Sequence, residues 1–132
     1  MSFTTALVAF AIITLLAVGL EIMFTYATQG FGFGFSSNRP AVQKSPLGLR
    51  IQRAYQNHVE SAAYIVPLLI AGQMTGLTGT TAEWVTLIII AGRAAFMVLY
   101  YTGIPFLRIL GFVGGSMGSM VLAYLLLSMA AV

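Results

Sequence analysis

The chain has 132 residues, of which 59% are hydrophobic and only 7% are charged. A soluble domain carries about a quarter charged residues, so this composition excludes an ordinary soluble domain and indicates a membrane protein. The sequence has no cysteine and one histidine, which excludes a disulfide framework and any metal site built from thiolates or several histidines of one chain. The formal net charge of +3 rests on too few basic residues to indicate nucleic-acid binding.

Apolar segments long enough to cross a bilayer, about 20 residues each, follow one another along residues 1–132, which we interpret as a single domain. We expect spans at about residues 4–27, 46–74, 81–101 and 105–129. This layout predicts an all-α integral membrane protein whose protomer is a four-helix bundle. The first apolar run lacks a basic start and an Ala-x-Ala cleavage pattern, so we interpret it as a mature span.

The link after the first span alternates Gly with Phe over residues 29–40. We expect an interfacial loop here, with the Phe side chains at the depth of the lipid headgroups. Ser45-Pro46 predicts the start of the second helix, with Ser45 as the N-cap residue and Pro46 at the first helical position. Pro67 lies inside this helix and predicts a kink or a free backbone carbonyl.

The third helix is expected to open with a capping box, Thr80-x-x-Glu83. Thr102-Gly103-Ile104-Pro105 breaks the chain, and Pro105 is expected to begin the fourth helix. That helix carries glycines at spacings that let another backbone approach closely, which predicts tight helix packing. These glycines are Gly111, Gly114, Gly115 and Gly118.

The basic residues predict the orientation in the membrane. Arg39, Lys44, Arg50 and Arg53 cluster at the link between the first and second spans, and Arg108 follows the link between the third and fourth. The positive-inside rule places both links on the cytoplasmic side and both termini on the opposite side. We expect the protein in the inner membrane of a bacterium.

The second helix carries the densest polar chemistry of the chain. At ~100° per residue, five of its polar residues share an arc of about 80° on one face. Charges within a membrane cost about 2.5–3.5 kcal/mol at the midplane, so they indicate function by default. Two structural alternatives remain, snorkelling of Arg50 toward the headgroups and an ion pair between Arg53 and Glu60. The five residues are Arg50, Arg53, Asn57, Glu60 and Tyr64.

Other polar residues of the spans have competing interpretations. Glu21 of the first span is expected to pair with an arginine of a neighbouring helix. Arg93 and Tyr100 share one side of the third helix, where a structural bridge and a ligand contact are both open. His58 lies off the polar face of its helix, and we expect it at the interface and not in catalysis.

The cytoplasmic ends of the last three helices therefore combine arginines, a carboxylate, an amide and tyrosines. This set suits a small anionic ligand that carries carboxylates and an ammonium group. Guanidinium groups hold carboxylates through two parallel hydrogen bonds, and Glu60 could hold the ammonium. The apolar residues nearby would accept a lipophilic co-substrate from the membrane.

Two segments carry a resemblance to a known family. Arg50-x-x-Arg53-Ala54-x-x-Asn57-x-x-Glu60 resembles the signature of the MAPEG family, the membrane-associated proteins of eicosanoid and glutathione metabolism. Arg93 and the segment Tyr101-Thr102-Gly103-Ile104-Pro105-x-x-Arg108 resemble the same family across its third and fourth helices. The chain looks like a bacterial-type member of the family that resembles the microsomal glutathione transferases. The resemblance implies a homotrimer that binds glutathione between neighbouring protomers near the cytoplasmic face.

The resemblance also implies roles for individual residues. Arg108 would stabilise the glutathione thiolate, and Tyr101 would be the second catalytic residue. No metal ion is implied. The glutathione-binding residues would be Arg50, Arg53, Asn57, Glu60, Tyr64 and Arg93.

The implied function is that of a membrane-bound glutathione transferase or peroxidase, in which the thiol attacks lipophilic electrophiles or lipid hydroperoxides. Its partners would be the lipid bilayer, glutathione as co-substrate, a lipophilic small molecule and other copies of the chain. One alternative is a non-catalytic, lipid-binding MAPEG-like protein. Another is a small proton-coupled transporter in which Glu21 is the coupling carboxylate.

Overall fold

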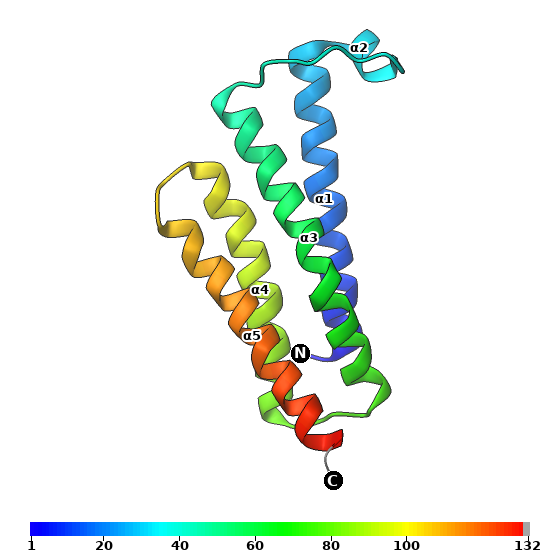
Figure 1. Cartoon of the computed structure of the whole chain (residues 1–132), viewed down its shortest axis with the longest axis vertical. Coiled ribbons are helices and arrows are strands. Elements are labelled where there is room, and N and C mark those ends of the chain that lie inside the picture. The colour runs from blue at the N-terminus through cyan, green and yellow to red at the C-terminus, as the bar shows by residue number, and fades with distance from the viewer. Residues whose placement is uncertain (131–132) are drawn as a thin grey trace.

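The computed structural model describes residues 1–130, which are helical apart from short links. Four long helices run alongside one another, and a five-residue helix, α2, follows the first of them (Figure 1). The long helices coincide within a few residues with the four apolar segments expected from the sequence. The helices are α1 (Phe3–Gln29), α2 (Phe31–Phe35), α3 (Pro46–Met74), α4 (Thr80–Thr102) and α5 (Leu107–Ala130).

Three helices within residues 1–130, α1, α4 and α5, are long and apolar enough to cross a membrane. Helix α3 is not among these three, and its first half carries Arg50, Arg53 and Glu60. With 29 residues, α3 is about 43 Å long, against about 30 Å for the hydrocarbon core. About 13 Å of the helix, its first turns, can therefore extend beyond the core while the rest of α3 crosses it.

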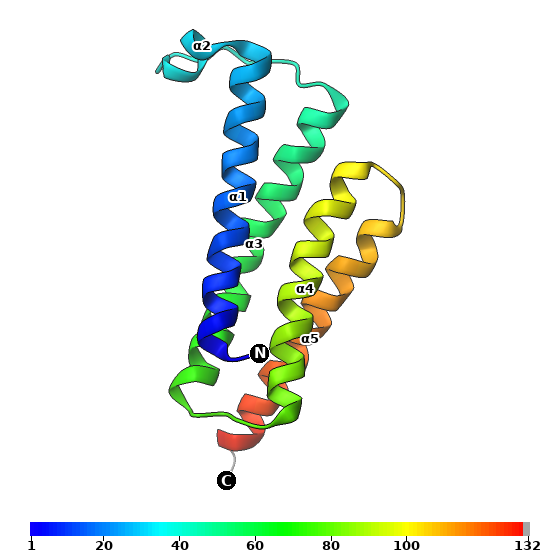
Figure 2. The same cartoon turned by 180° about the vertical axis from the view of Figure 1, so that it is seen from behind.

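The bundle consists of two helix pairs that pack against each other. Helix α1 packs along α3, α4 packs along α5, and contacts of α3 with α4 join the pairs. The link from α1 to α3 and the turn from α4 to α5 lie at one end of the bundle (Figures 1 and 2). The N-terminus and the link from α3 to α4 lie at the other end. The two links that carry the basic residues thus lie at the same end of the bundle. That this end faces the cytoplasm remains a prediction.

The start of α3 is the one that the sequence predicts. Ser45 is the N-cap, and its Oγ accepts a hydrogen bond from the backbone N–H of Gly48 at 3.2 Å, while Pro46 occupies the first turn. Gly48 lies against Phe24 of α1, where an added Cβ would come within 2.9 Å of the ring. This glycine therefore lets the first turn of α3 approach α1 closely.

The expected capping box at the start of α4 is wrong. The N-cap is Gly79, with φ +115°, and no side chain caps the helix, so Thr80 is already its first residue. A positive φ of this kind favours glycine, and the turn at Gly79 sets the helix start one residue earlier than the pattern indicates. The carbonyl of Glu83 instead accepts a hydrogen bond from the N-terminal ammonium group at 2.8 Å.

The other helix boundaries also differ from the expectation in two places. Residues 29–40 are not a loop throughout, because Phe31–Phe35 form the short helix α2. The last helix begins at Leu107 and not at Pro105. Phe106 has φ +67°, which interrupts the helical backbone between Pro105 and Leu107.

Helices α4 and α5 approach each other through glycines. A Cβ added at Gly92 of α4 would lie 2.6 Å from the backbone nitrogen of Gly115 and 2.9 Å from the carbonyl oxygen of Gly111. The close packing expected from the glycine spacing of the last helix is therefore present within one chain. An apolar cluster of the core includes Phe3, Phe10, Ile65, Leu69, Ile89 and Leu122.

Candidate functional site

A fully buried arginine lies at the centre of the candidate site. Arg93 of α4 has no exposed surface, and its Nη2 donates to Oδ1 of Asn57 of α3 at 3.0 Å. Its Cζ lies 4.9 Å from the centre of the Phe96 ring. Within residues 1–130, Nε and Nη1 of Arg93 are buried without a hydrogen-bond partner. A guanidinium group that is buried with one neutral partner is costly, which indicates a functional position.

The neighbouring helix makes room for this arginine. A Cβ added at Gly115 of α5 would lie 2.9 Å from Cδ of Arg93, so only a glycine leaves space for the Arg93 stem at this separation. The same glycine stripe that brings α5 against α4 therefore accommodates the buried arginine. Arg93 of α4 is thus enclosed by residues of two other helices, Asn57 of α3 and Gly115 of α5.

Arg93 also begins a row of stacked groups along α4, the cation–aromatic row, which comprises Arg93, Phe96, Tyr100 and Arg108. The rings of Phe96 and Tyr100 meet edge to face with centres 5.3 Å apart. Cζ of Arg108, from the first turn of α5, lies 4.5 Å from the centre of the Tyr100 ring. Cations are attracted to the faces of aromatic rings, so the row orders both guanidinium groups relative to α4.

Tyr101 occupies a different face of α4 from this row. It lines an apolar groove of about 210 Å³ between α1 and α4, together with Leu16, Leu20 and Met97. The tyrosine that contacts Arg108 is therefore Tyr100, whereas the family resemblance implied a catalytic role for Tyr101. The spacing of seven between Arg93 and Tyr100 places both on one face of the helix, as expected, but it does not reveal that Arg108 packs on the Tyr100 ring.

Arg50 links the start of α3 to the turn between α4 and α5. Its guanidinium lies against Gly103, where an added Cβ would come within 2.7 Å of Nη1 of Arg50. Gly103 has φ +73° and ends α4, and this conformation favours glycine. The half-buried Arg50 side chain therefore packs on the α4–α5 turn.

The other residues of the polar face of α3 are exposed. Arg53, Glu60 and Tyr64 lie at the surface of the single chain, and Gln56 Nε2 donates to Glu60 Oε1 at 3.1 Å. The alternative of a structural ion pair between Arg53 and Glu60 is wrong, because the ion pair within residues 1–130 is Glu21–Lys44. Glu60 lines a groove of about 270 Å³ whose walls include Glu21 and Gln56. One chain thus brings together Asn57 with Arg93 and Tyr100 with Arg108, but it does not bring Arg53 and Glu60 to Arg108.

His58 is not interfacial, as the sequence suggested, but fully buried against α1. Its ring stacks on Phe10 with centres 4.3 Å apart, and its Nε2 lies 3.0 Å from Oγ1 of Thr14. Thr14 donates its own proton to the carbonyl of Phe10, so it accepts a hydrogen bond from Nε2–H of His58. His58 therefore joins α3 to α1 on the side of α3 that faces away from the exposed Arg53.

The partner of Glu21 also differs from the expectation. Its Oε1 lies 3.3 Å from Nζ of Lys44, which belongs to the link before α3, and not beside an arginine of another helix. Within the described part of the chain, no three His, Cys, Asp or Glu side chains form a group that could hold a metal ion.

A comparison with protein families decides the family of this chain. The MAPEG family model matches residues 3–128. The chain belongs to the MAPEG family. This family includes glutathione transferases and eicosanoid-related proteins. No match was found among curated proteins or among solved structures.

Family membership and the apolar helices together show that this MAPEG protein is an all-helical integral membrane protein. The match covers both the polar face of α3 and the segment from Arg93 to Arg108. The site residues thus lie within the part of the chain that defines the family, while their individual roles remain predictions.

Removing the partner of the buried arginine should destabilise the bundle. In Asn57→Leu, Arg93 would lose its hydrogen bond to an amide, which leaves a further buried N–H unpaired at a cost of about 1–3 kcal/mol. We expect a lower melting temperature of the detergent-solubilised protein. Gln56→Leu is the matched control, because it removes an amide that is exposed, and it should change the melting temperature little. Equal effects of both substitutions would contradict the role given to Asn57.

Proposed function

We propose that this MAPEG protein is a membrane-bound glutathione transferase or peroxidase that activates the glutathione thiol. The observation that carries the proposal is the state of Arg93, which is fully buried, bonded only to Asn57 and left with unpaired Nε and Nη1 groups. Such a cation has the capacity to bind an anion between the helices. Glutathione offers two carboxylates, an ammonium group and a thiol within one small molecule.

The chain supplies groups that match this ligand. Arg50, Arg53 and Arg93 would bind its carboxylates, because guanidinium groups and carboxylates form paired, charge-assisted hydrogen bonds. Glu60 would accept hydrogen bonds from the ammonium group, and Tyr64 would donate to the ligand from the next turn of α3. Asn57 would hold Arg93 in place.

The exposure of Arg53, Glu60 and Tyr64 supports binding between protomers. These side chains face outward from the single chain, so a neighbouring copy could complete the site around the ligand. We propose that the copies form a homotrimer, as the sequence resemblance implies. In this arrangement α3 would present its polar face to the α4–α5 turn of a neighbour.

Arg108 would act on the sulfur. A thiol with a pKa of about 8.5 is mostly protonated at neutral pH, and an adjacent fixed cation lowers that pKa. The thiol proton leaves to water, and the thiolate then attacks an electrophilic carbon of the second substrate. A carbon–sulfur bond forms, and the leaving group departs with the electron pair of the bond that breaks.

The lipophilic substrate would arrive from the bilayer. The apolar groove between α1 and α4 is open to the surface and ends at Tyr101. In this groove the hydrocarbon chain of a lipid substrate would lie against Leu16 and Met97. The Tyr101 hydroxyl could then donate a hydrogen bond to a polar group of the same substrate. The groove equally suits the second candidate function, a non-catalytic lipid-binding protein, which would bind lipid without glutathione turnover.

Calorimetric titration of glutathione separates these functions. We expect binding heat with the detergent-solubilised protein and an affinity at least about tenfold lower for Arg53→Ala, because a charge-assisted hydrogen bond contributes about 1.5–3 kcal/mol. Arg39→Ala is the matched control, since it removes the same charge from a residue outside the polar face of α3, and it should bind normally. Absence of binding heat with the unmodified protein would contradict the proposed function.

Substitution of Arg108 tests the activation of the thiol. We expect bound glutathione to show thiolate absorbance near neutral pH with the unmodified protein and to lose it in Arg108→Ala. The pH midpoint of thiolate formation should rise toward that of a free thiol, about 8.5, because the stabilising cation is gone. Arg108→Lys keeps the charge and should retain part of the absorbance. An unchanged midpoint in Arg108→Ala would exclude this role.

A further inference from the structure

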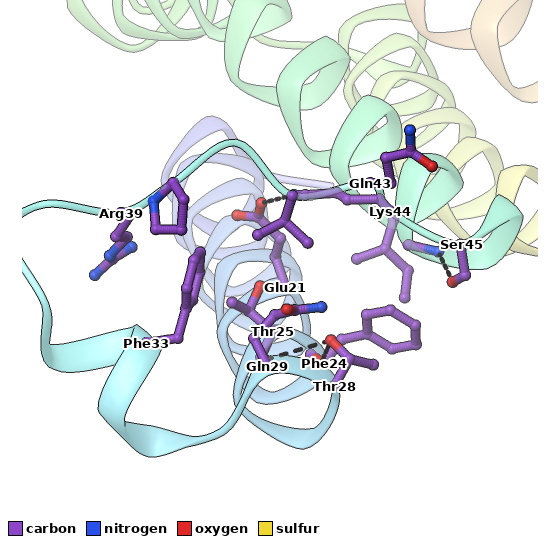
Figure 3. A pocket seen from close by; sticks show the side chains of 14 residues that line it. Glu21, Phe24, Thr25, Thr28, Gln29, Phe33, Arg39, Gln43, Lys44 and Ser45 are labelled. Atoms are coloured by element: carbon purple, nitrogen blue, oxygen red, sulfur yellow. Dashed lines mark hydrogen bonds and ion pairs between the residues drawn. The ribbon is translucent and has the colours of Figure 1, made fainter.

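A second pocket lies outside the candidate site, at the end of the bundle where α1 joins the link to α3 (Figure 3). It has a volume of about 410 Å³. Its walls come from the last turns of α1, from α2, from the link and from the first turns of α3. None of the residues proposed to bind glutathione lines it. The pocket is therefore separate from the glutathione site.

Two cations and one carboxylate set the charge of the pocket. Lys44 and Glu21 form the ion pair at 3.3 Å, and Arg39 adds a positive charge that has no carboxylate partner within residues 1–130. One carboxylate against two cations leaves an excess of one positive charge. The pocket therefore favours an anionic ligand.

Arg39 is held in position by three contacts. Its Cζ lies 5.8 Å from the centre of the Phe33 ring, its Nε donates to the carbonyl of Ser36 at 3.1 Å, and its Nη2 donates to the carbonyl of Gly34. Both carbonyls belong to α2 or its C-cap, so the short helix orients the guanidinium. Arginine carries five N–H donors, and the remaining ones are available to a ligand. Lys44 likewise keeps donors beyond the one that it gives to Glu21.

The rest of the pocket is largely apolar. Phe24, Phe33, Val42 and Ile51 provide hydrocarbon surface beside the charged groups. The side chains of Phe31 and Phe35 on the adjacent α2 are 67% and 78% exposed. Exposed aromatic residues at the end of a membrane-spanning helix are typical of the headgroup region. The pocket thus combines fixed cations, apolar walls and an interfacial position.

We propose that this pocket binds the headgroup of an anionic phospholipid. The phosphate accepts hydrogen bonds from Lys44, and the glycerol backbone packs against Phe24 and Val42. Arg39, stacked on Phe33 at the rim of the pocket, adds a second positive charge for the anionic headgroup. Inorganic phosphate shares the charge but has no hydrocarbon to bury against these walls. The apolar walls and the interfacial position therefore favour the lipid over a soluble anion.

Lipid binding can be measured by native mass spectrometry of the solubilised protein with added phosphatidylglycerol or phosphatidylcholine. We expect phosphatidylglycerol to bind at least about tenfold more tightly than phosphatidylcholine. The double substitution Arg39→Gln/Lys44→Gln should remove this preference, because it removes both cations of the pocket and with them the charge-assisted contact to the phosphate. Val42→Phe, which fills the pocket and keeps its charges, should also weaken binding. Helix content by circular dichroism establishes that each variant folds.

Arg53→Gln is a control for overall charge, since it removes one exposed positive charge outside the pocket and should leave the lipid preference unchanged. An equal loss in Arg53→Gln would show that lipid binding reflects the overall charge and would overturn the proposal. Competition by millimolar inorganic phosphate would overturn the assignment to a lipid. Competition by glutathione would also overturn it, because the pocket would then belong to the glutathione site. Failure of glutathione to bind at all would leave the lipid result unaffected.

Discussion

The structure depends on the burial of one cation, Arg93, within the bundle. Its guanidinium has a single amide partner in Asn57, an aromatic neighbour in Phe96 and no carboxylate with which it forms an ion pair within residues 1–130. Removing such a group from water is expensive, so the surrounding helices must supply compensating packing. A ligand anion that accepts from its remaining N–H groups would supply the missing compensation. Arg93 is therefore both the residue that constrains the packing of the helices and a proposed ligand contact.

The packing of the helices explains why the cation can be accommodated. Glycines let α5 lie close to α4 and leave room for the Arg93 stem beside Gly115. Where α3 packs on α1, the buried His58 stacks on Phe10 and bonds to Thr14, which fixes the rotation of α3 relative to α1. That rotation directs Asn57 toward Arg93. The same helix then presents Arg53 outward, where a second protomer can reach it.

Sequence reasoning predicted the helices well because apolar length, and the Ser45-Pro46 start of α3, are local properties. It was less successful where the environment of a side chain depends on which neighbouring helix packs against it. Helical periodicity places His58 off the polar face but does not reveal that α1 covers it. The wrong capping box has a different origin, since the turn at Gly79 depends on backbone conformation. The contact of Arg108 with Tyr100 depends on how the backbone enters α5, and the spacing of residues does not determine this.

The central claim is that glutathione binds where the first turns of α3 meet the turn between α4 and α5 of a neighbouring protomer. Amide hydrogen exchange of the solubilised protein, with and without glutathione, tests this claim most directly. We predict slower exchange for residues 47–57 and 103–107 in the presence of glutathione, with no change for residues 75–80 at the opposite end of the bundle. Unchanged exchange at both segments, or slowing confined to residues 29–45, would contradict the account.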